Sequence, residues 1–564
     1  MNYIDNYLIW CNADLKDSEK QELLSIKDND EELKGRFGQE LQFGTAGMRG
    51  VMGMGSNRLN DYTVRRAAQG MASWLAETDL PKRAAIAYDS RHNSAAFAEV
   101  CAVALAEAGI TVFLFDRLAP TPMLSYAVRQ LKCGCGIVIS ASHNSGEYNG
   151  VKCYGPDGCQ MTDEPASVVT QKIRDIAYFV PASISLAECV RKGFVKYIEP
   201  ALWEAYYQTV LAEAINPDKI PAADLRVVYT PLCGTGNEPV REVFKRLGVH
   251  TTVVACQELP DGDFKTCEYP NPETDAALRE SYQVAKKTPC DLILGTDPDC
   301  DRVAIAVPFA GGFKKLSGNE LGFMLLEYIL AARARKGDLP ADAVAVRSIV
   351  SSPLADRIAD HYGVQMKAVL TGFKYIGGEI LKLEEQGHDD RFVFGFEESC
   401  GYLKGTYARD KDAVVASMLV CEMAADLKLQ GMTILDKLES IYNQYGLYLA
   451  SVKSVELTGA DAMEKAANIM LQLRNNAPAQ IGGQTVTVVR DYKTRIETDV
   501  ITGTQEVIAL PASNVLEYVL GESGSVIVRP SGTEPKVKYY FTAVAETLEG
   551  AQEKMDAMVR QLSE

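Results

Sequence analysis

The fold is decided by short apolar runs that recur along the chain, of which AAIAYDS at residues 84–90 is the first. The runs fall into three sets with the same order. The first set continues with ITVFLF (110–115) and GIVIS (136–140); the second is LRVVYT (225–230), HTTVVA (250–255) and DLILG (291–295); the third is AVAVRSIV (343–350), VQMKAVL (364–370) and RFVFGF (391–396). Uninterrupted apolar runs of this length are typical of buried parallel strands. Their repetition predicts three similar units in series.

Helical patterns separate these strands. They read SAAFAEVCAVALAEAG (94–109), NEPVREVFKRLG (237–248) and SPLADRIADHYG (352–363). Each opens with a polar residue, which favours an N-cap, and closes at a glycine, which favours a helix end. The last stretch, roughly 450–564, holds the alternating runs VKSVEL, QTVTVVRDY and GSVIVRPS before a helical tail. It predicts an α+β module with a more antiparallel sheet.

These patterns predict an α/β protein of four domains around a central cleft. Three domains are repeated units with mixed α/β sheets, and the fourth is a C-terminal α+β domain. A chain of 564 residues is long enough for three or four domains, each with its own core. We expect domain I at residues 1–206, domain II at 207–324, domain III at 325–448 and domain IV at 449–564.

The composition excludes several classes of protein. Lys and Arg number 58 against 75 Asp and Glu, and the net charge of −17 opposes binding to nucleic acid or to anionic membranes, so we expect neither partner. No apolar run approaches the ~20 residues of a membrane-spanning helix, and MNYIDNYLIW does not resemble a secretion signal. The 14 scattered cysteines favour reduced core thiols. We therefore expect a cytoplasmic protein. We also expect a monomer or a weak homodimer.

A polar cluster follows the third strand of each repeated set, and a fourth follows a strand of the C-terminal module. The clusters are SASHNS (140–145), TDPDCDR (296–302), FEESCGY (396–402) and RPSGTEPKVK (529–538). Ligands of open parallel sheets bind beyond the carboxyl ends of the strands. The four clusters are therefore predicted to contribute loops to a common cleft.

The second cluster has the composition of a metal site. Asp297, Asp299 and Asp301 alternate with other residues, so that their carboxylates face one side of the loop and favour a cation between them. Oxygen ligands favour a hard ion, and we expect Mg²⁺. An EF-hand is excluded because its sixth and twelfth positions would be Arg302 and Pro308. The alternative is a solvated acidic turn.

The first cluster has the composition of a phosphoryl-transfer site. Ser142 follows a predicted strand, lies beside His143 and precedes Lys152 by ten residues. A serine can carry a phosphoryl group where a cation offsets the charge and an acid–base group handles the hydroxyl proton. The alternative is a polar turn with a surface histidine.

The fourth cluster suits a phosphate. Arg529 offers a guanidinium, Ser531 and Thr533 offer hydroxyls, and Gly532 permits close approach of the backbone. An ordinary turn is the alternative.

Three other segments carry candidate binding residues. FGTAGMRG, which holds Thr45 and Arg49, suits the same role in phosphate binding. Glu397 and Ser399 in the third cluster suit recognition of sugar hydroxyls. Lys374, in a loop after a predicted strand, is a candidate proton donor or phosphate ligand.

Together these motifs resemble those of the α-D-phosphohexomutases, most closely the phosphoglucomutase group, in the family's order and over nearly the whole chain. The resemblance implies that Ser142 is a phosphoserine nucleophile, which with the three aspartates holds Mg²⁺. Arg302 would contact the reacting phosphate or the sugar. Further implied roles are sugar binding by Glu397 and Ser399, binding of the other phosphate by Arg529, Ser531, Gly532 and Thr533, and charge and proton transfer by Arg49, His143, Lys152 and Lys374.

The sequence departs from the family pattern at a few positions. Ser145 replaces the usual proline after the His-Asn pair, and Ser140 stands where threonine is common. The metal loop reads DPDCDR rather than DGDGDR, which changes its stiffness but keeps every carboxylate. Because His143 is the only histidine in a motif, the second acid–base group is assigned to Lys374.

The resemblance implies an enzyme that interconverts glucose 1-phosphate and glucose 6-phosphate. Mg²⁺ would be the cofactor and glucose 1,6-bisphosphate the intermediate and activator, with a small sugar phosphate as the substrate. Phosphopentomutase, phosphomannomutase and bisphosphate synthase activities are alternatives within the family. Two other classes are a Mg²⁺-dependent sugar phosphatase with Asp297 as nucleophile and a non-catalytic sensor of sugar phosphates.

Overall fold

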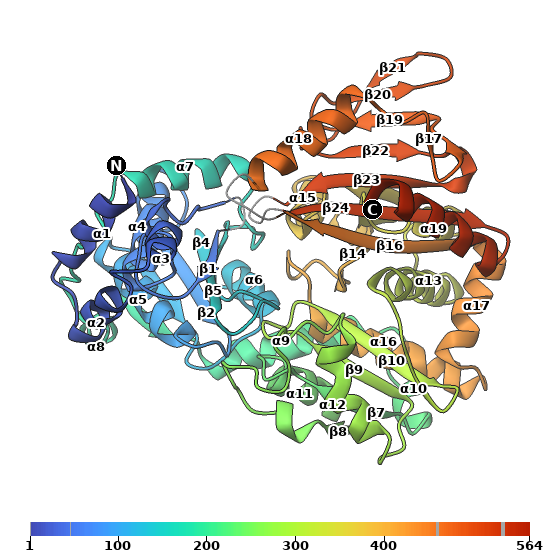
Figure 1. Cartoon of the computed structure of the whole chain (residues 1–564). Coiled ribbons are helices and arrows are strands. Elements are labelled where there is room, and N and C mark those ends of the chain that lie inside the picture. The colour runs from blue at the N-terminus through green and yellow to red at the C-terminus, as the bar shows by residue number, and fades with distance from the viewer. Residues whose placement is uncertain (1, 45–46, 458–461, 532–535, 564) are drawn as a thin grey trace. The chain divides into compact units, whose positions relative to one another are not determined.

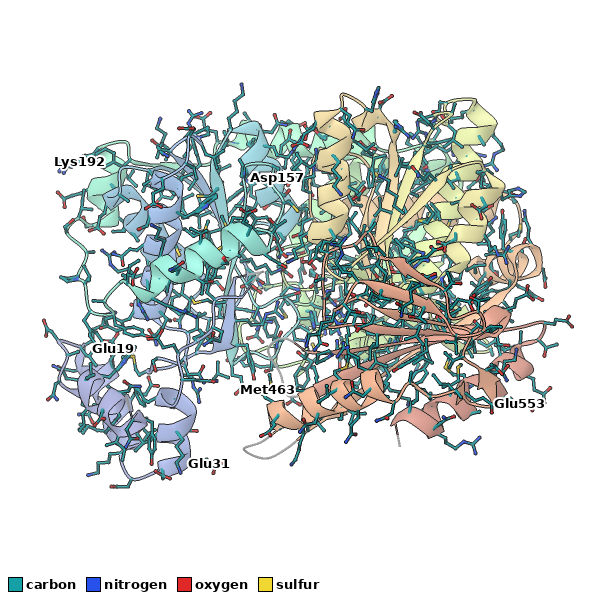
Figure 2. All side chains as sticks on the ribbon, turned by 90° about the horizontal axis from the view of Figure 1, so that it is seen from above. Glu19, Glu31, Asp157, Lys192, Met463 and Glu553 are labelled. Atoms are coloured by element: carbon teal, nitrogen blue, oxygen red, sulfur yellow. The ribbon has the colours of Figure 1, made fainter. Side chains whose placement is uncertain are left out.

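The structure is a computed structural model that describes residues 2–44, 47–457, 462–531 and 536–563 (Figure 1). The chain divides into two compact units. The first comprises Met1–Gly318, Ile376–Phe394 and Ser399–Gly431, and the second comprises Asn319–Tyr375, Gly395–Glu398 and Met432–Glu564. Charged side chains such as those of Glu31, Lys192 and Glu553 are exposed (Figure 2).

Three short helices precede the first sheet. They are α1 (Tyr3–Cys11), α2 (Asp17–Ser25) and α3 (Asp30–Phe37). Asn2 caps α1 and Asn29 caps α3, each through a side-chain oxygen that accepts a backbone N–H. Trp10 and Phe37 meet edge to face, with ring centroids 6.1 Å apart, in a small apolar core of their own. The strand repeat gave no indication of this helical segment.

The first sheet has six strands in the order β1-β5-β4-β2-β3-β6. The strands are β1 (Met48–Val51), β2 (Arg83–Tyr88), β3 (Thr111–Leu114), β4 (Cys135–Ile139), β5 (Tyr148–Tyr154) and β6 (Val195–Tyr197). β2 pairs in parallel with β3 and β4, and β5 runs antiparallel to β4 and β1. The associated helices are α4 (Asp61–Ala76), α5 (Ser94–Glu107), α6 (Thr121–Gln130), α7 (Asp163–Arg174) and α8 (Leu186–Arg191).

The second sheet repeats this pattern in the order β11-β10-β9-β7-β8. The strands are β7 (Arg226–Thr230), β8 (His250–Val253), β9 (Leu292–Thr296), β10 (Val303–Phe309) and β11 (Gly312–Lys315). β7 pairs in parallel with β8 and β9, and β10 runs antiparallel to β9. The helices of this region are α9 (Pro200–Ala212), α10 (Lys219–Ala222), α11 (Asn237–Leu247), α12 (Asp275–Ala285) and the 3₁₀ turn η1 (Ala255–Gln257). The loops after β4 and β9 therefore occupy equivalent places in the two sheets.

The third set of apolar runs also forms strands. β12 (Val344–Ser348) and β13 (Gln365–Val369) pair in parallel, as β7 and β8 do. β14 (Phe392–Glu397) and β15 (Gly401–Leu403) follow. The helices of this region are α13 (Gly318–Lys336), α14 (Leu354–His361), α15 (Phe373–Glu385), η2 (Asp389–Arg391), α16 (Ala413–Leu429) and α17 (Ile434–Tyr445).

The C-terminal part is an antiparallel sheet with helices, as predicted. Its seven strands have the order β16-β24-β23-β22-β19-β20-β21. They are β16 (Leu447–Glu456), β19 (Val488–Asp491), β20 (Ile496–Asp499), β21 (Gln505–Val507), β22 (Leu516–Val519), β23 (Gly524–Pro530) and β24 (Lys536–Ala545). α18 (Ala462–Asn475), η3 (Gly521–Ser523), α19 (Leu548–Ser563) and the short pair β17 (Gln480–Ile481) and β18 (Gln484–Thr485) complete it. QTVTVVRDY, expected as one strand, is split between β18 and β19.

The glycine ends of the helices were predicted correctly, whereas the N-cap role expected of the opening polar residues was not; α5 and α11 still begin at the predicted residues, Ser94 and Asn237. Gly109, Gly248 and Gly363 follow α5, α11 and α14 with φ of +79°, +76° and +68°, the left-handed conformation that glycine adopts at low cost. None of these three helices has a side-chain N-cap hydrogen bond. Ser94, expected to cap α5, instead donates its hydroxyl to Asp89 Oδ1 at 2.7 Å.

Two further features concern the apolar character of the helices and the state of the cysteines. Among the helices that the structure describes, none has the length and apolar character needed to cross a bilayer. All 14 cysteines lie within the described residues and are free thiols.

Gly377 and Gly378 form a matched pair within α15. A Cβ at position 377 would lie 2.6 Å from Cys159 Sγ and 2.8 Å from the carbonyl oxygen of Arg409, whereas a Cβ at position 378 would meet nothing within 4 Å. Alanine gains about 1 kcal/mol of helix propensity over glycine at either position, and overpacking costs about 1–3 kcal/mol. We expect Gly377→Ala to lower the melting temperature and Gly378→Ala to raise it, as measured by calorimetry. Equal shifts would contradict the close packing at Gly377.

Candidate active site

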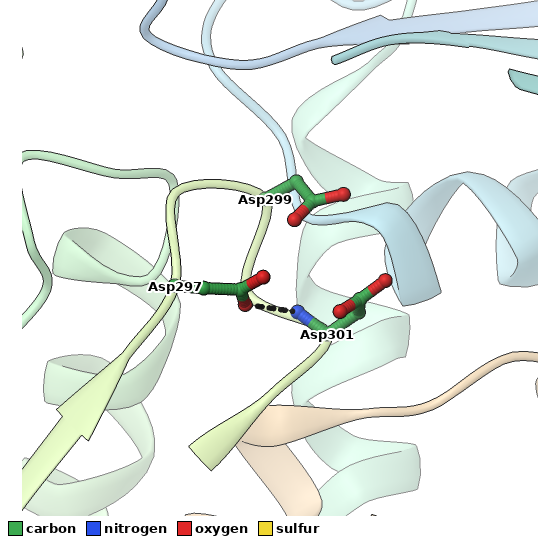
Figure 3. Close-up of side chains that lie close together, drawn as sticks. All are labelled: Asp297, Asp299 and Asp301. Carbon is green, nitrogen blue, oxygen red and sulfur yellow. Dashed lines mark hydrogen bonds between the residues drawn. The ribbon is translucent and has the colours of Figure 1, made fainter. Parts of the chain in front are cut away.

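The loop between β9 and β10 brings three aspartates together (Figure 3). Asp297, Asp299 and Asp301 are 0 %, 0 % and 2 % exposed, and one carboxylate oxygen of each lies within 4.8 Å of the others. Asp297 Oδ1 accepts the backbone N–H groups of Asp301 at 3.1 Å and Arg302 at 2.9 Å. These two bonds fix the orientation of the Asp297 carboxylate within the loop.

The oxygen atoms of this cluster suit a cation. Asp299 Oδ1 and Asp301 Oδ1 are buried and have no hydrogen-bond partner among the residues that the structure describes. A buried carboxylate oxygen without a partner is costly, and carboxylates this close repel one another. A hard divalent cation prefers oxygen ligands of this kind. The residues present therefore fit a metal site.

Two buried lysines offset part of the negative charge. Lys152 Nζ lies 2.5 Å from Asp299 Oδ2 and 3.3 Å from Asp301 Oδ2. Lys411 Nζ lies 3.3 Å from the same Asp301 oxygen.

The charges in this cluster shift one another's pKa values. Burial alone would lower the pKa of Lys152, but the two carboxylates outweigh this effect and raise that pKa. Burial likewise opposes ionisation of Asp299, and the attraction of Lys152 outweighs it and lowers the pKa. At Asp297, burial and the two neighbouring carboxylates raise the pKa.

Ser142 lies beside this cluster, on the loop that follows β4. Its Oγ donates a hydrogen bond to Asp297 Oδ2 at 2.7 Å. His143 Nδ1 lies 3.2 Å from the same hydroxyl, and Ser140 Oγ accepts the Ser142 N–H at 2.8 Å. The φ of Ser142 is +52°, a conformation that costs a residue other than glycine about 1–3 kcal/mol. Strain of this kind persists where the surrounding structure fixes the backbone.

Cationic groups surround the Ser142 loop. Arg49, on β1, donates to Asn144 Oδ1 at 2.9 Å, and Arg302 Nη1 lies 3.1 Å from Glu273 Oε1. Burial, followed by the positive charges of Arg302 and Arg49, lowers the pKa of His143 well below 6.5. The imidazole is therefore neutral at pH 7 in this structure.

The second unit holds the other candidate binding residues. Glu397, at the end of β14, accepts the backbone N–H of Gly372 through Oε1 at 2.7 Å. Lys374 is buried, at 8 % exposure, near the start of α15. Arg529 and Ser531, at and just after the end of β23, line a cavity of about 430 Å³.

Four predicted site residues are not among those described in the paragraphs above. Ser399 belongs to the first unit and is half-buried there. Thr45, Gly532 and Thr533 lie outside the described residues.

Family models match the chain in four consecutive segments. The models are those of phosphoglucomutase/phosphomannomutase: alpha/beta/alpha domain I at residues 40–178, domain II at 204–309, domain III at 317–445 and the C-terminal domain at 487–558. The chain belongs to the phosphoglucomutase/phosphomannomutase family. This membership confirms the family resemblance and the fold class of three repeated α/β domains followed by a C-terminal domain.

A relative supports this assignment, and solved structures share the fold. The chain is 36% identical over 534 residues to a phosphoglucomutase of Staphylococcus aureus strain MSSA476, over 94% of each chain. The open form of parafusin (phosphoglucomutase) from Paramecium shares the fold with a TM-score of 0.66 and 17% identity, over 92% of this chain and 93% of that chain. A phosphoglucomutase/phosphomannomutase family protein of Burkholderia thailandensis has a TM-score of 0.64 and 18% identity, over 93% and 98%. Members of this family are metal-dependent phosphohexomutases, which are isomerases.

Sequence reasoning missed several residues around the metal loop. Lys411 lies in ARDKDAV (408–414), a string of alternating charges directly before the buried helix α16, and that charge pattern was the available signal. Thr121, the first residue of α6, donates its hydroxyl to Asp299 Oδ2 at 2.9 Å. Glu273, the partner of Arg302, follows no motif.

Removal of Lys411 tests the charge balance of the carboxylate cluster. Lys411→Met deletes an ammonium group 3.3 Å from Asp301 and with it a repulsion against any bound cation. Because charges a few ångströms apart interact by several kcal/mol in a protein, we expect divalent-cation affinity to rise at least about tenfold. The melting temperature of the metal-free variant should fall. Titration calorimetry of metal-free protein measures the affinity.

Lys404→Met is the matched control for this variant. Lys404 is also largely buried and its partner is the carboxylate of Glu213, at 2.6 Å. Its loss should leave cation affinity unchanged. Equal or weaker cation binding by Lys411→Met than by the control would contradict the proposed balance.

Proposed function

We propose that the chain is a phosphoglucomutase, which reversibly interconverts α-D-glucose 1-phosphate and glucose 6-phosphate. The observation that carries this proposal is the contact between Ser142 Oγ and Asp297 Oδ2, at 2.7 Å, within a buried cluster of three carboxylates. A hydroxyl beside a cation site is suited to carry a phosphoryl group. The sugar is proposed from the relatives named phosphoglucomutase, which are 36% identical over 94% of the chain.

Mg²⁺ is the proposed cofactor. Asp297, Asp299 and Asp301 would hold it together with an oxygen at Ser142, and the buried oxygens without partners at Asp299 and Asp301 support this assignment. When bound, such an ion neutralises charge that develops on a transferring phosphoryl group.

Ser142 is the proposed carrier of the phosphoryl group. Its phosphoryl would pass to the free hydroxyl of the sugar phosphate, which breaks the bond to Ser142 Oγ and forms glucose 1,6-bisphosphate. After the bisphosphate has turned over, the other phosphoryl would return to Ser142. His143, with Nδ1 at 3.2 Å, is placed to exchange the hydroxyl proton. Lys152 would balance the negative charge of the carboxylates that bind the metal, and Lys374 would be the second acid–base group.

The substrate would be bound at both ends. A sugar that carries a phosphate at either end needs one fixed phosphate site, one reactive site and hydroxyl contacts that serve both orientations. The cavity beside Arg529 and Ser531 supports a phosphate site in the second unit. The residues proposed to bind substrate are Thr45, Arg49, Arg302, Glu397, Ser399, Arg529, Ser531, Gly532 and Thr533.

Two alternative activities remain: the same reaction on another sugar, and hydrolysis of a sugar phosphate. Phosphomannomutase or phosphopentomutase activity would use the same site with another sugar. A sugar phosphatase would need Asp297 as the nucleophile, but both of its oxygens are engaged. Oδ1 accepts two backbone N–H groups and Oδ2 accepts the Ser142 hydroxyl. The hydrogen bonding therefore favours the mutase.

We also propose domain boundaries at residues 206, 324 and 448, because each lies in or close to a gap between matched family segments. A cytoplasmic location and a monomeric or weakly dimeric state are proposed with them. The 14 free thiols support the reducing compartment.

Ser142→Ala tests the function. The wild type, supplied with Mg²⁺, glucose 1-phosphate and a trace of glucose 1,6-bisphosphate, should form glucose 6-phosphate without releasing inorganic phosphate. Loss of the nucleophile should lower kcat at least about a thousandfold. A coupled assay with phosphate monitored in the same samples measures both products.

Ser281→Ala is the matched control. Ser281 is also a buried serine, and its hydroxyl has no hydrogen-bond partner among the described residues, so the variant should keep wild-type activity. Phosphate release that survives in Ser142→Ala would instead support the phosphatase. Faster turnover of mannose 1-phosphate or ribose 1-phosphate than of glucose 1-phosphate would assign one of the other sugars.

A further inference from the structure

Arg91 is a buried arginine to which the proposed mechanism gives no role. It follows β2, and its Nε faces Asp89 Oδ2 at 3.3 Å with both side chains fully buried. Asp89 Oδ1 accepts the backbone N–H of Arg91 at 3.0 Å and the hydroxyl of Ser94 at 2.7 Å. The guanidinium is thereby fixed at the carboxyl end of β2. There it meets residues 140–148, here called the nucleophile loop, which follow the neighbouring parallel strand β4.

Arg91 holds the backbone of the nucleophile loop at four points. Its Nη2 donates to the carbonyl oxygens of Ser142 at 2.6 Å and Asn144 at 2.5 Å. Its Nη1 donates to those of Ser145 at 2.7 Å and Tyr148 at 3.0 Å. The fixed fork of a guanidinium suits several acceptors at once, which an ammonium group cannot reproduce. One side chain therefore sets the path of the loop that carries the proposed nucleophile.

The hold on Ser142 coincides with its strained backbone. Ser142 has a φ of +52°, and its carbonyl oxygen is one of the four acceptors of Arg91. A residue other than glycine keeps such a conformation only where its surroundings fix it. The bond from Arg91 to this carbonyl oxygen supplies such a constraint, while the Ser142 hydroxyl donates to Asp297.

Residues 262–264, in the loop between η1 and α12, contact Arg91 and its neighbour His92. The ring of buried Phe264 lies 5.0 Å from the Arg91 guanidinium carbon, within the range of a cation–π contact. Asp263 Oδ1 pairs with His92 Nε2 at 2.6 Å. Gly262 packs so closely that a Cβ there would lie 2.7 Å from the backbone nitrogen of His92. The nucleophile loop of the first sheet is thus braced by a loop of the second.

We propose that Arg91, braced by Phe264, is a positioning residue that holds Ser142 in line for phosphoryl transfer. Arg91 acts through the four carbonyl oxygens of the nucleophile loop and does not itself take part in the chemistry. The proposal rests on the proposed function, because it takes Ser142 as the nucleophile.

Arg91→Lys tests this role, because it keeps the charge and removes the fork. Misplacement of a reacting group by about 1 Å costs about a hundredfold in rate, so we expect kcat to fall by about that factor. The KM for glucose 1-phosphate should stay within about twofold, since the variant leaves the substrate-binding residues in place. If Arg91 had a purely structural role, Arg91→Lys would lower the amount of folded protein, and the folded fraction would keep both the kcat and the KM of the wild type.

Arg66→Lys is the matched control. Arg66 is also a buried arginine of the first unit, and it donates to the carbonyl oxygens of Ile176 at 2.8 Å and Ile173 at 3.0 Å. Its guanidinium carbon lies 3.8 Å from the ring centroid of Tyr178. None of these contacts involves the nucleophile loop. We expect a loss of melting temperature similar to that of Arg91→Lys and a kcat within about threefold of the wild type.

The transfer step can be measured directly. Each protein is loaded with glucose 1,6-bisphosphate, and the phosphoryl group on Ser142 is followed by intact-protein and peptide mass spectrometry after glucose 1-phosphate is added. The single-turnover rate should fall about a hundredfold in Arg91→Lys. Phe264→Leu, which removes the ring face and keeps an apolar side chain, should slow transfer by about two- to fivefold. This second variant keeps the test decisive if Arg91→Lys does not fold.

The outcomes separate the two proposals. Wild-type transfer rates in Arg91→Lys or Phe264→Leu, or an equal loss in Arg66→Lys, would overturn the positioning role while the function stands. A wild-type protein that takes no phosphoryl group on Ser142 would overturn the function, and the positioning role with it.

Discussion

The repulsion among three buried carboxylates is the constraint on which the rest of the first unit depends. Asp297, Asp299 and Asp301 are at most 2 % exposed and lie within 4.8 Å of one another, so cations must come to them from other segments. Lys152 reaches them from β5, and Lys411 from the segment before α16. The metal loop therefore ties β5 and the segment before α16 to the second sheet.

A shared backbone turn explains how three repeated sets carry different chemistry. Ser142, Cys300 and Cys400 lie a few residues beyond β4, β9 and β14, and their φ angles are +52°, +55° and +60°. Left-handed residues other than glycine are uncommon, so the coincidence points to one loop geometry used three times. The geometry aims a hydroxyl from the first loop and carboxylates from the second at the same place, where Ser142 meets Asp297.

Local sequence patterns were enough to predict the strands and the aspartate motif. They could not predict which hydrogen-bond and ion-pair partners the folded chain brings to a side chain. Apolar runs indicate burial, so the strands of each set were predictable from the sequence, as was the alternation of aspartates in one loop. Ser94 had the pattern of an N-cap, but its hydroxyl donates instead to Asp89, a buried carboxylate in the same connection between β2 and α5. Arg91 had no recognisable motif and Lys411 had only a run of alternating charges, because their partners are backbone carbonyls and a carboxylate supplied by distant segments.

The departure of the metal loop from the glycine-spaced family pattern is compensated in a facing loop. Pro298 and Cys300 bring bulk where other branches carry glycine. A Cβ at Gly234 would lie 2.4 Å from Pro298 Cα, and one at Gly236 would lie 2.9 Å from Cys300 Sγ. Both residues of the metal loop can pack there because the facing segment lacks side chains at these positions. The left-handed backbone of Cys300 carries a conformational cost that glycine would avoid, and the complete burial of its thiol offsets that cost. The loop thus gains stiffness from proline and packing, while its three carboxylates keep their spacing.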